Sequence, residues 1–307
     1  MSTKPQRLTL AVPVFNAQEF LPATLESLNA QEEHVCWWLQ DGASKDRTIE
    51  IARSFARPCD TVVCEPDSGQ PDALNRAFAK MGGEIIGFLN GDDILTPGTA
   101  ERALAYFEDH PELDLIYGRV EWMDRNGKTT GHHAGCIQSL EEVLDIYGVW
   151  WSQRQWVQPE VFFRRSLWEK TAGFQTKWNL AFDYDFWVRC FRAGARVAHV
   201  PAVGARFRIH SGQKSNASEL AADEIRGIVS EHLSDGAEIG TLFQQRLHAH
   251  LSYDLYQLGK TTIPGKRRTP FVTALLRHPL WFLCPSVRAR AKSSLAKLLG
   301  FRRRTIV

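Results

Sequence analysis

Apolar residues in the first 110 positions form short runs that alternate with segments of helical spacing. The runs predict strands at residues 8–14, 35–39, 61–64 and 85–89, the first of them buried. Between the runs, apolar side chains recur every three or four positions, which indicates amphipathic helices. These helices are expected at residues 22–30, 48–57, from Pro71 onward, and 96–110. Regular alternation of strand and helix is typical of a parallel sheet with crossover helices, so the pattern predicts an α/β fold.

After residue 110 the alternation is less regular. Strands are expected at residues 113–122, 161–163 and 197–209, with a hairpin turn at Asn126-Gly127. Helix starts are indicated by Thr96-Pro97 and by two capping boxes, Ser139 with Glu142 and Ser166 with Glu169. Further helices are expected at residues 183–193, 217–233 and 238–258. We therefore expect three regions: an α/β domain at 1–215, a helical extension at 216–260 and a tail at 261–307.

Composition narrows the class of protein. The chain has 307 residues, of which 44% are hydrophobic and 23% charged, as in ordinary soluble domains. The six cysteines are scattered without a C-x-x-C pair, which favours reduced thiols over a disulfide framework or a zinc site. No apolar stretch approaches the roughly 20 residues that span a bilayer, and no secretory signal is recognisable. These features predict a cytoplasmic location.

The charges are distributed unevenly. Twelve Lys and Arg residues and no acid follow Asp254, whereas the chain up to Asp254 has a net charge of −10. The same tail also contains large apolar residues, among them Phe271, Leu275, Leu276, Leu280, Trp281, Phe282 and Leu283. A core-packing helix with a solvated basic face is one interpretation, and nucleic-acid binding is another, although it would not need the apolar residues. We favour an anionic membrane surface as the partner of residues 261–307, and no nucleic acid.

Acidic residues follow the predicted strands of the first half. Asp41 ends one strand, and Asp92 and Asp93 come just after another. In α/β proteins, ligands bind in the crevice at the carboxyl ends of parallel strands. Two adjacent carboxylates repel each other unless a cation lies beside them, so the pair predicts a divalent metal that carries a diphosphate. The alternative is a solvated acidic turn.

Several ordered segments carry a family resemblance. They are residues 11–16, 40–48, 65–75, 83–93, 158–160, 173–174, 182–189 and 207–210. Together they resemble the family 2 glycosyltransferases, which have the nucleotide-sugar-binding fold called GT-A. The resemblance covers roughly residues 7–215. It implies inverting transfer of a sugar from a nucleoside-diphosphate sugar, here a UDP-sugar, to a hydroxyl of a saccharide or lipid-linked saccharide, with Mg²⁺ or Mn²⁺.

The resemblance also implies roles for individual residues. The donor nucleotide would be bound by Pro13, Asn16, Asp41, Gly42, Glu65, Asp67, Gln70, Asp72, Asn90 and Gly91, and the metal by Asp92, Asp93 and His210. Asn90 stands where the family's Asp-x-Asp motif has its first acid, which concentrates the metal hypothesis on Asp92. Structural alternatives remain open: an Asx turn for Asp41, helix N-terminal charges for Asp67 and Asp72, and a satisfied histidine for His210.

Asp183 is the predicted catalytic base. On the helix that it begins, Asp185 has Arg189 at i+4, which indicates a structural ion pair, whereas Asp183 has Trp187 there. A carboxylate beside aromatic surface tends to have a raised pKa, which suits a general base. The resemblance places the base at the same residue. The alternative is an ordinary acid at a helix N-terminus.

Two questions of function stay open at this point. Trp150, Trp151 and Trp156 form either a stacking platform for a sugar acceptor or part of the core. A nucleotidyltransferase acting on sugar phosphates would need a Gly-rich basic loop after the first strand, where residues 15–19 have neither glycine nor a basic residue. A non-catalytic binding or scaffold protein of the same fold is a further alternative. We favour a glycosyltransferase attached peripherally to the inner face of the cell membrane.

Overall fold

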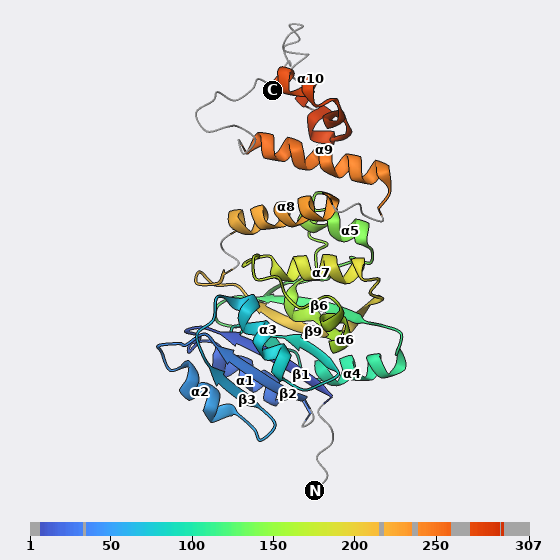
Figure 1. The fold of residues 1–307 in the computed structure, drawn as a ribbon. Coiled ribbons are helices and arrows are strands. Elements are labelled where there is room, and N and C mark those ends of the chain that lie inside the picture. The colour runs from blue at the N-terminus through green and yellow to red at the C-terminus, as the bar shows by residue number, and fades with distance from the viewer. Residues whose placement is uncertain are drawn as a thin grey trace, which may run out of the picture. The chain divides into compact units, whose positions relative to one another are not determined.

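The computed structural model describes residues 7–32, 35–214, 218–234, 239–258, 271–288 and 290–291 (Figure 1). By its internal contacts the chain divides into two compact units, residues 1–225 (unit 1) and 226–307 (unit 2). The division falls within helix α8 (Ser218–Ser234). Residues 261–270 and 292–307 of the predicted tail lie outside the described residues.

Unit 1 is built on one sheet. The described strands are β1 (Leu8–Val14), β2 (Val35–Asp41), β3 (Thr61–Cys64), β4 (Ile85–Phe88), β5 (Ile94–Leu95), β6 (Leu115–Met123), β7 (Thr129–His133), β8 (Val161–Arg164) and β9 (Val197–Arg208). Their order is β3-β2-β1-β4-β8-β6-β9-β5, and β7 pairs with β6. The first four strands in this order are parallel, as are β6 and β9, and β8 is antiparallel to both of its neighbours. The predicted α/β class is confirmed, and the sheet is mixed around β8.

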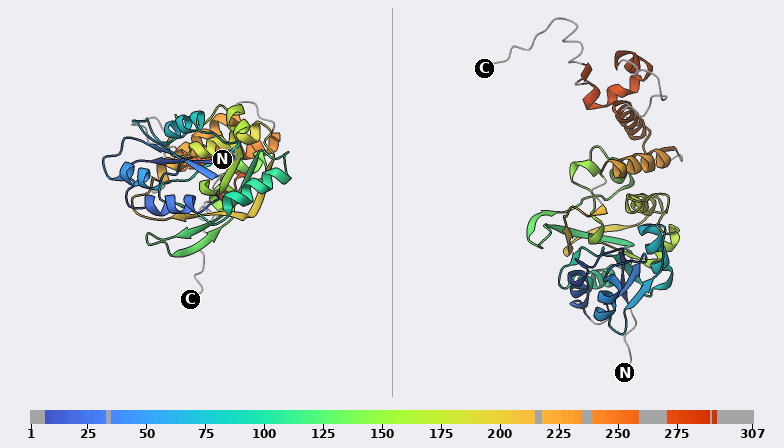
Figure 2. Two further views of the ribbon diagram at one scale, coloured as in Figure 1. Left: turned by 90° about the horizontal axis from the view of Figure 1, so that it is seen from below. Right: turned by 90° about the vertical axis from the view of Figure 1, so that its left-hand side faces the viewer.

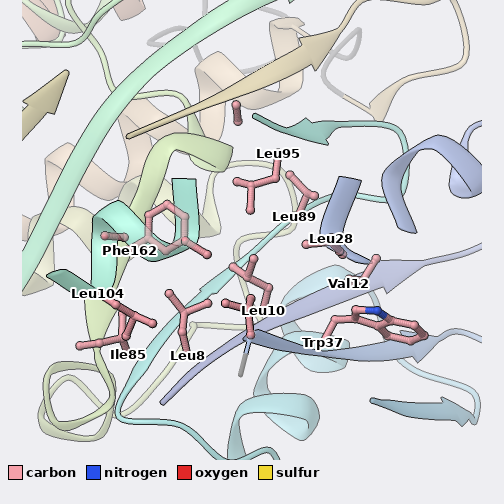
Figure 3. Packing of buried hydrophobic residues seen from close by; sticks show 14 of the residues in the cluster. Leu8, Leu10, Val12, Leu28, Trp37, Ile85, Leu89, Leu95, Leu104 and Phe162 are labelled. Carbon is pink, nitrogen blue, oxygen red and sulfur yellow. The ribbon is translucent and has the colours of Figure 1, made fainter. Parts of the chain in front are cut away.

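Helices lie on both faces of this sheet (Figure 2). The described helices of unit 1 before α8 are α1 (Leu21–Asn29), α2 (Thr48–Phe55), α3 (Gln70–Lys80), α4 (Thr99–Asp109), α5 (Leu140–Leu144), α6 (Arg165–Lys170) and α7 (Phe182–Arg192), with 3₁₀ helices η1 (Trp150–Ser152) and η2 (Gln158–Glu160). Leu8, Leu10 and Val12 alternate along β1 and join a buried cluster with residues of α1 and α4 (Figure 3). Burial of each such side chain contributes about 1.5–3 kcal/mol, which fixes the strands that carry the site.

Aromatic residues form a second buried cluster. Phe78 of α3 lies 6.0 Å from Phe163 of β8, measured between ring centroids, and Phe163 lies 5.1 Å from Phe186 of α7. Phe174 lies 4.9 Å from Phe186 and 5.8 Å from Phe88 at the end of β4. The cluster therefore joins α7 to the sheet directly behind the loop that follows β4.

Two predicted helix starts are wrong. Helix α4 begins at Thr99 after Gly98, whose φ of 69° lies in the left-handed region, and Thr96 instead donates from Oγ1 to the Gly204 carbonyl at 2.8 Å. Helix α6 begins at Arg165 with no side-chain cap, so Ser166 and Glu169 form no capping box. By contrast, Ser139 does cap α5, because its Oγ accepts from the Glu142 amide at 3.1 Å. A capping motif in the sequence does not show whether hydrogen bonds to distant residues engage the capping side chain instead.

Unit 2 is helical in its described part. It contains α9 (Thr241–Gln257), α10 (Phe271–Arg277) and the 3₁₀ helix η4 (Pro279–Leu283). Its small core gathers around Tyr253, Tyr256 and Trp281. Of the helices in the described ranges, none has both the length and the apolar character needed to cross a bilayer.

Candidate active site

A pocket of about 1170 Å³ opens in unit 1 at the carboxyl ends of β1, β2 and β4. Ten of the residues proposed from the sequence line it: Pro13, Asn16, Gly42, Asp67, Gln70, Asn90, Gly91, Asp92, Asp183 and His210. Four others do not line it: Asp41, Glu65, Asp72 and Asp93. Residues from both halves of unit 1, more than 100 positions apart, therefore converge on one cavity.

Asp92 and His210 form a pair at this pocket. The Nε2 atom of His210 lies 3.0 Å from Oδ2 of Asp92, and the two side chains are 11% and 29% exposed. The His210 ring also packs against Phe20, with ring centroids 4.7 Å apart, and its backbone amide donates to Gln213 at 2.7 Å. A carboxylate oxygen and an imidazole nitrogen at this separation are two groups that a divalent cation accepts as ligands.

Asn90 belongs to a polar chain along the pocket floor. Its Oδ1 accepts from Gln70 Nε2 at 2.8 Å, and its Nδ2 donates to Asp93 Oδ2 at 3.4 Å. Gln70 Oε1 in turn accepts from Lys214 Nζ at 3.3 Å. The Asn90 amide thus links Gln70 to Asp93 at the acidic turn, and Gln70 in turn contacts Lys214. An aspartate in its place would put a second charge directly beside Asp93, which the amide avoids.

Asp93 points into the protein. The residue is 1% exposed, and its Oδ1 accepts from the Arg208 backbone amide at 2.9 Å. Arg208 Nε donates to the Asp92 carbonyl at 2.8 Å, and the Asp93 carbonyl accepts from Thr24 Oγ1 at 2.7 Å. Burial, together with the neighbouring charge of Asp92, raises the pKa of Asp93 well above its usual range. Asp93 therefore joins the turn after β4 to the end of β9.

Asp183 is at the start of α7 and lines the pocket. Its Oδ1 accepts from the Tyr184 amide at 2.8 Å. Burial raises the pKa of Asp183 to about 6, although backbone hydrogen bonds and the charge of Lys214 act in the opposite direction. Its helical neighbour Asp185 is engaged elsewhere, with Arg189 Nε at 2.7 Å, which confirms the predicted structural ion pair. At neutral pH Asp183 is thus an ionised carboxylate with raised proton affinity, the property of a general base.

The loops after β1 and β2 are joined by hydrogen bonds. Asn16, at a left-handed φ of 50°, donates from its backbone amide to Ser44 Oγ at 2.7 Å and accepts at Oδ1 from the Lys45 amide at 2.9 Å. Asp41 is fully buried and accepts from both the amide and the hydroxyl of Ser44. Its carboxylate also accepts from Cys64 Sγ at 3.0 Å. In this structure Asp41 shapes the loop that presents Gly42 to the pocket.

Two glycines at the pocket are closely surrounded. A Cβ atom on Gly42 would lie 2.8 Å from Asp67 Oδ2, and one on Gly91 would lie 2.6 Å from Val14 Cγ1. Asp67 itself accepts at Oδ1 from the Gly69 amide at 2.9 Å. Any larger residue at these glycines would displace the walls, so their small size keeps the pocket open on this side.

Glu65 and Asp72 are engaged with basic residues outside the pocket. Arg76 lies 2.8 Å from Asp72 and 3.6 Å from Glu65, measured between charged atoms. Asp72 also accepts from the Ser68 amide at 2.9 Å. The two acids thus hold the loop that leads into α3, and through it the position of Gln70.

One wall of the pocket, formed by β6 and β9, is aromatic. Trp122 of β6 and Phe207 of β9 line it, and their rings meet edge to face at 5.4 Å. Of the three tryptophans singled out in the sequence, only Trp156 reaches the pocket, and it is otherwise buried against Tyr117 and Trp187. Trp150 packs on Tyr184 with centroids 4.4 Å apart. Trp156 therefore fills the core, whereas Trp150 is half-buried and Trp151 is 39% exposed.

Lys214 is a pocket residue that our reading of the sequence missed. Its Nζ donates to the Asn179 carbonyl at 2.6 Å and to Asn179 Oδ1 at 3.0 Å. Burial lowers the pKa of Lys214, while the charges of Asp183, Glu224 and Asp67 raise it. The sequence feature that could have identified Lys214 was its position, four residues after His210 in a loop that follows a predicted strand.

A group of three possible metal ligands lies away from the pocket. Within the described residues, Cys36, Cys59 and Asp60 offer atoms within 4.8 Å of one another. Arg57, however, donates to both oxygens of Asp60, at 2.8 Å and 3.1 Å. Burial and the adjacent thiol of Cys59 raise the pKa of Cys36 to about 12, which keeps it protonated. A carboxylate already bound to arginine and a protonated thiol do not favour a cation at this group of residues.

The fold and this pocket define a glycosyltransferase of the GT-A class. Residues 9–188 match the family described as Glycosyl transferase family 2, so the chain belongs to that family and is a glycosyltransferase. The PGL/p-HBAD biosynthesis glycosyltransferase of Mycobacterium tuberculosis is 29% identical over 197 residues, covering 62% of this chain and 71% of that protein. An uncharacterized glycosyltransferase of Methanocaldococcus jannaschii is 22% identical over 189 residues, covering 60% and 64%.

Solved structures show the same fold at low identity. S. aureus TarS 1-349 in complex with UDP-GlcNAc superposes with a TM-score of 0.61 at 16% identity, covering 82% of this chain and 73% of that chain. The full S. aureus TarS chain is longer, and this chain spans 46% of it. The mannosyltransferase PcManGT from Pyrobaculum calidifontis, in complex with GDP-Man and Mn²⁺, gives 0.59 at 18% identity, covering 98% and 89%. The predicted GT-A fold is confirmed by these likenesses.

Proposed function

We propose that this glycosyltransferase moves a sugar from a nucleoside-diphosphate sugar to an acceptor hydroxyl in one displacement, with inversion at the anomeric carbon. Such a step needs a base for the hydroxyl and stabilisation of the departing diphosphate. The observation that carries the proposal is that Asp183 and the Asp92–His210 pair line the same pocket. A UDP-sugar is the first donor to test, since TarS 1-349 was crystallised with UDP-GlcNAc.

We assign a divalent cation, Mg²⁺ or Mn²⁺, to Asp92 and His210. The two groups fit such an ion because they offer an oxygen and a nitrogen ligand, 3.0 Å apart, and both line the pocket. When bound, the cation would stabilise negative charge on the departing diphosphate. Asp93, assigned to the metal from the sequence, is in this proposal a residue that positions Asp92. The Mn²⁺ in the PcManGT structure supports use of a metal.

The nucleotide is assigned to the side of the pocket formed by the first half of the chain. We propose that Pro13, Asn16, Gly42, Asp67, Gln70 and Gly91 contact it, since they line the pocket there. Asp41, Glu65 and Asp72 would act indirectly through the loops that they hold. Lys214 would add a positive charge for the diphosphate, because it lies within reach of Gln70 and faces Asp183.

The acceptor is assigned to the aromatic wall. Trp122 and Phe207 offer apolar faces on which a pyranose ring can pack, and Asp183 lines the same cavity. We propose a saccharide or lipid-linked saccharide as the acceptor, and a location at the inner surface of the cell membrane. The concentration of basic residues after Asp254 supports the location.

Release of nucleoside diphosphate from UDP-sugars and GDP-mannose, with and without Mn²⁺, tests the proposal. We expect Mn²⁺-dependent release by the wild type and a loss of about 100-fold or more in Asp92→Ala, the effect typical of removing one transition-state stabiliser. Asp109→Ala, at an exposed position of α4, is the matched control and should behave as the wild type.

The products distinguish the alternatives. A nucleotidyltransferase would release pyrophosphate from a nucleoside triphosphate and a sugar phosphate, and a binding protein would release neither product. Equal rates for Asp92→Ala and wild type in the presence of metal would show that the metal assignment is wrong. An α-linked product from an α-linked donor, seen by NMR, would contradict inversion.

A further inference from the structure

The surface of unit 2 carries three exposed large apolar side chains close together in the sequence. Leu276, Leu280 and Phe282 are 79%, 51% and 49% exposed. They belong to α10 and η4, which together span Phe271 to Leu283. Single exposed leucines are ordinary on protein surfaces, but three exposed large apolar residues within seven positions are a concentration that favours a partner.

The neighbouring residues on these two elements already fill the core. Trp281 is 3% exposed, its ring lies 5.4 Å from Tyr253 and 5.2 Å from Tyr256, and its Nε1 donates to Ser252 Oγ at 3.1 Å. Ala274 is likewise buried in this cluster. Turning Leu280 or Phe282 inward would expel Trp281. The exposed residues therefore have no place within the described part of unit 2.

The side chains of Arg288 and Arg290 hold this arrangement. Arg288 Nη1 donates to the carbonyls of Phe282 at 2.8 Å and Leu283 at 3.1 Å, at the end of η4. Arg290 lies over the ring of Phe271 at 4.4 Å and donates to the Tyr253 hydroxyl at 3.3 Å. The hydrogen bonds from Arg288 fix the backbone at the end of η4, and with it the outward direction of Phe282.

The charged residues that follow α9 in the sequence are all basic. Arg277 follows Leu276 directly and is exposed, and no acidic residue occurs after Asp254. Leucine and phenylalanine beside arginine suit the boundary between lipid headgroups and acyl chains, where the apolar groups enter and the cations stay with phosphates. A nucleic acid would use the charges but leave the apolar side chains in water.

We propose that Leu276, Leu280 and Phe282 are the membrane-contacting edge of this protein, which enters the outer acyl region of an anionic bilayer with Arg277 at the phosphates. The inference gives the membrane location proposed above a specific surface. It does not depend on the sugar chemistry, because vesicle binding and transfer to a soluble acceptor are measured separately.

The test is sedimentation of the full chain with phospholipid vesicles. Vesicles of phosphatidylcholine with about 30% phosphatidylglycerol supply the anionic surface, and pure phosphatidylcholine vesicles are the comparison. The triple variant Leu276→Ser, Leu280→Ser, Phe282→Ser should bind the anionic vesicles at least 30-fold more weakly than the wild type. The matched control replaces three other exposed leucines, Leu220, Leu242 and Leu258, with serine and should bind within about twofold, as expected for surface substitutions outside the contact.

Leu276→Asp alone provides a second variant, because the residue is 79% exposed and its substitution leaves the core intact. It should weaken binding at least 10-fold while the thermal unfolding midpoint stays unchanged. Equal binding of the triple variant and wild type would overturn the proposal, as would a larger loss in the control. A variant that loses self-association in sedimentation velocity but keeps vesicle binding would instead show that this edge contacts a second copy.

Discussion

Two features of the environment of Asp183 act on its pKa in opposite directions. The first turn of α7 offers backbone amides that stabilise the charged form, whereas burial disfavours it. Burial is the larger effect, and the pKa is raised to about 6. The resulting carboxylate is more basic than an exposed aspartate and still ionised at neutral pH.

The pH dependence of transfer follows from this pKa. A base acts only when ionised, so kcat/KM should rise about tenfold per pH unit below pH 6 and level off above it. Asp183→Asn should lose about 1000-fold or more in kcat, since the residue then cannot accept the proton. The measurement is initial-rate kinetics with a fixed acceptor between about pH 4.5 and 8. A wild-type profile without a transition near pH 6 would contradict the assignment of the base.

Ionisation of Asp183 affects the unfolding free energy in the opposite direction: the pH that activates the base lowers the stability of the fold. Because the folded-state pKa of Asp183, about 6, lies above the ordinary value of 3.8, its contribution is present at low pH and lost as pH rises through 6. Asparagine does not ionise. Asp183→Asn should therefore match the wild type near pH 4 but exceed its unfolding free energy by about 2–3 kcal/mol at pH 8. Urea unfolding at both pH values checks this, and an equal difference at the two would show that the pKa is not raised.

Lys214 should affect both the donor and the base. If it contacts the diphosphate, Lys214→Met should raise the donor KM about tenfold or more, as expected for a lost charged hydrogen bond, and Lys214→Arg should recover part of this. Its charge also lowers the pKa of Asp183, so the pH profile of Lys214→Met should move to higher pH. A variant with lower stability but unchanged KM and pH profile would indicate that Lys214 only holds Asn179 in place.

At the residue scale, the sequence identified the acidic residues but not the direction of their side chains. Asp92 lines the pocket, whereas Asp93, its neighbour, accepts a hydrogen bond from the Arg208 amide in the interior. Asp41 is likewise satisfied by Ser44. These partners are set by tertiary contacts, in the case of Asp93 with a strand 115 positions away, which no local pattern contains.

At the scale of elements, the parallel half was predictable because each of its strands contains a short, largely apolar run. All seven residues of β1 are buried, as the run predicted. β5 has only two residues and was not predicted, since its pairing with β9 is what makes it a strand. The start of α4 was placed too early for the same reason, because Thr96 hydrogen-bonds to Gly204.

The connection between the turn after β4 and the end of β9 depends on Asp93. Asp93→Ala removes the acceptor of the buried Arg208 amide and should lower the unfolding free energy by about 1–3 kcal/mol. Asp93→Asn keeps an acceptor and should cost less. Urea unfolding measures both, with Asp109→Asn on the exposed side of α4 expected within about 0.5 kcal/mol of wild type. Equal stability of Asp93→Ala and wild type would show that this connection does not hold the turn.

At the scale of the whole molecule, local patterns do not determine the order of strands. β8 inserts between β4 and β6, antiparallel to both, although it comes after α5 in the chain. The position of β8 brings the second half of the sheet, with Trp122 and Phe207, to the same pocket as Asp92. The separation of charge before and after Asp254, by contrast, can be read from the sequence directly, because counting charges needs no knowledge of contacts.

That separation predicts how membrane binding responds to salt. The chain has a net charge of −10 up to Asp254 and twelve basic residues after it, so only its C-terminal part is attracted to an anionic surface. Raising NaCl from about 50 to 500 mM shortens the screening length from about 14 Å to 4 Å and should weaken binding to anionic vesicles at least tenfold. The binding that remains should come from Leu276, Leu280 and Phe282, and should therefore be absent in their triple serine variant at high salt. Sedimentation across a salt series measures both effects. Wild-type binding that does not change with salt would mean that the basic residues contribute nothing to the attachment.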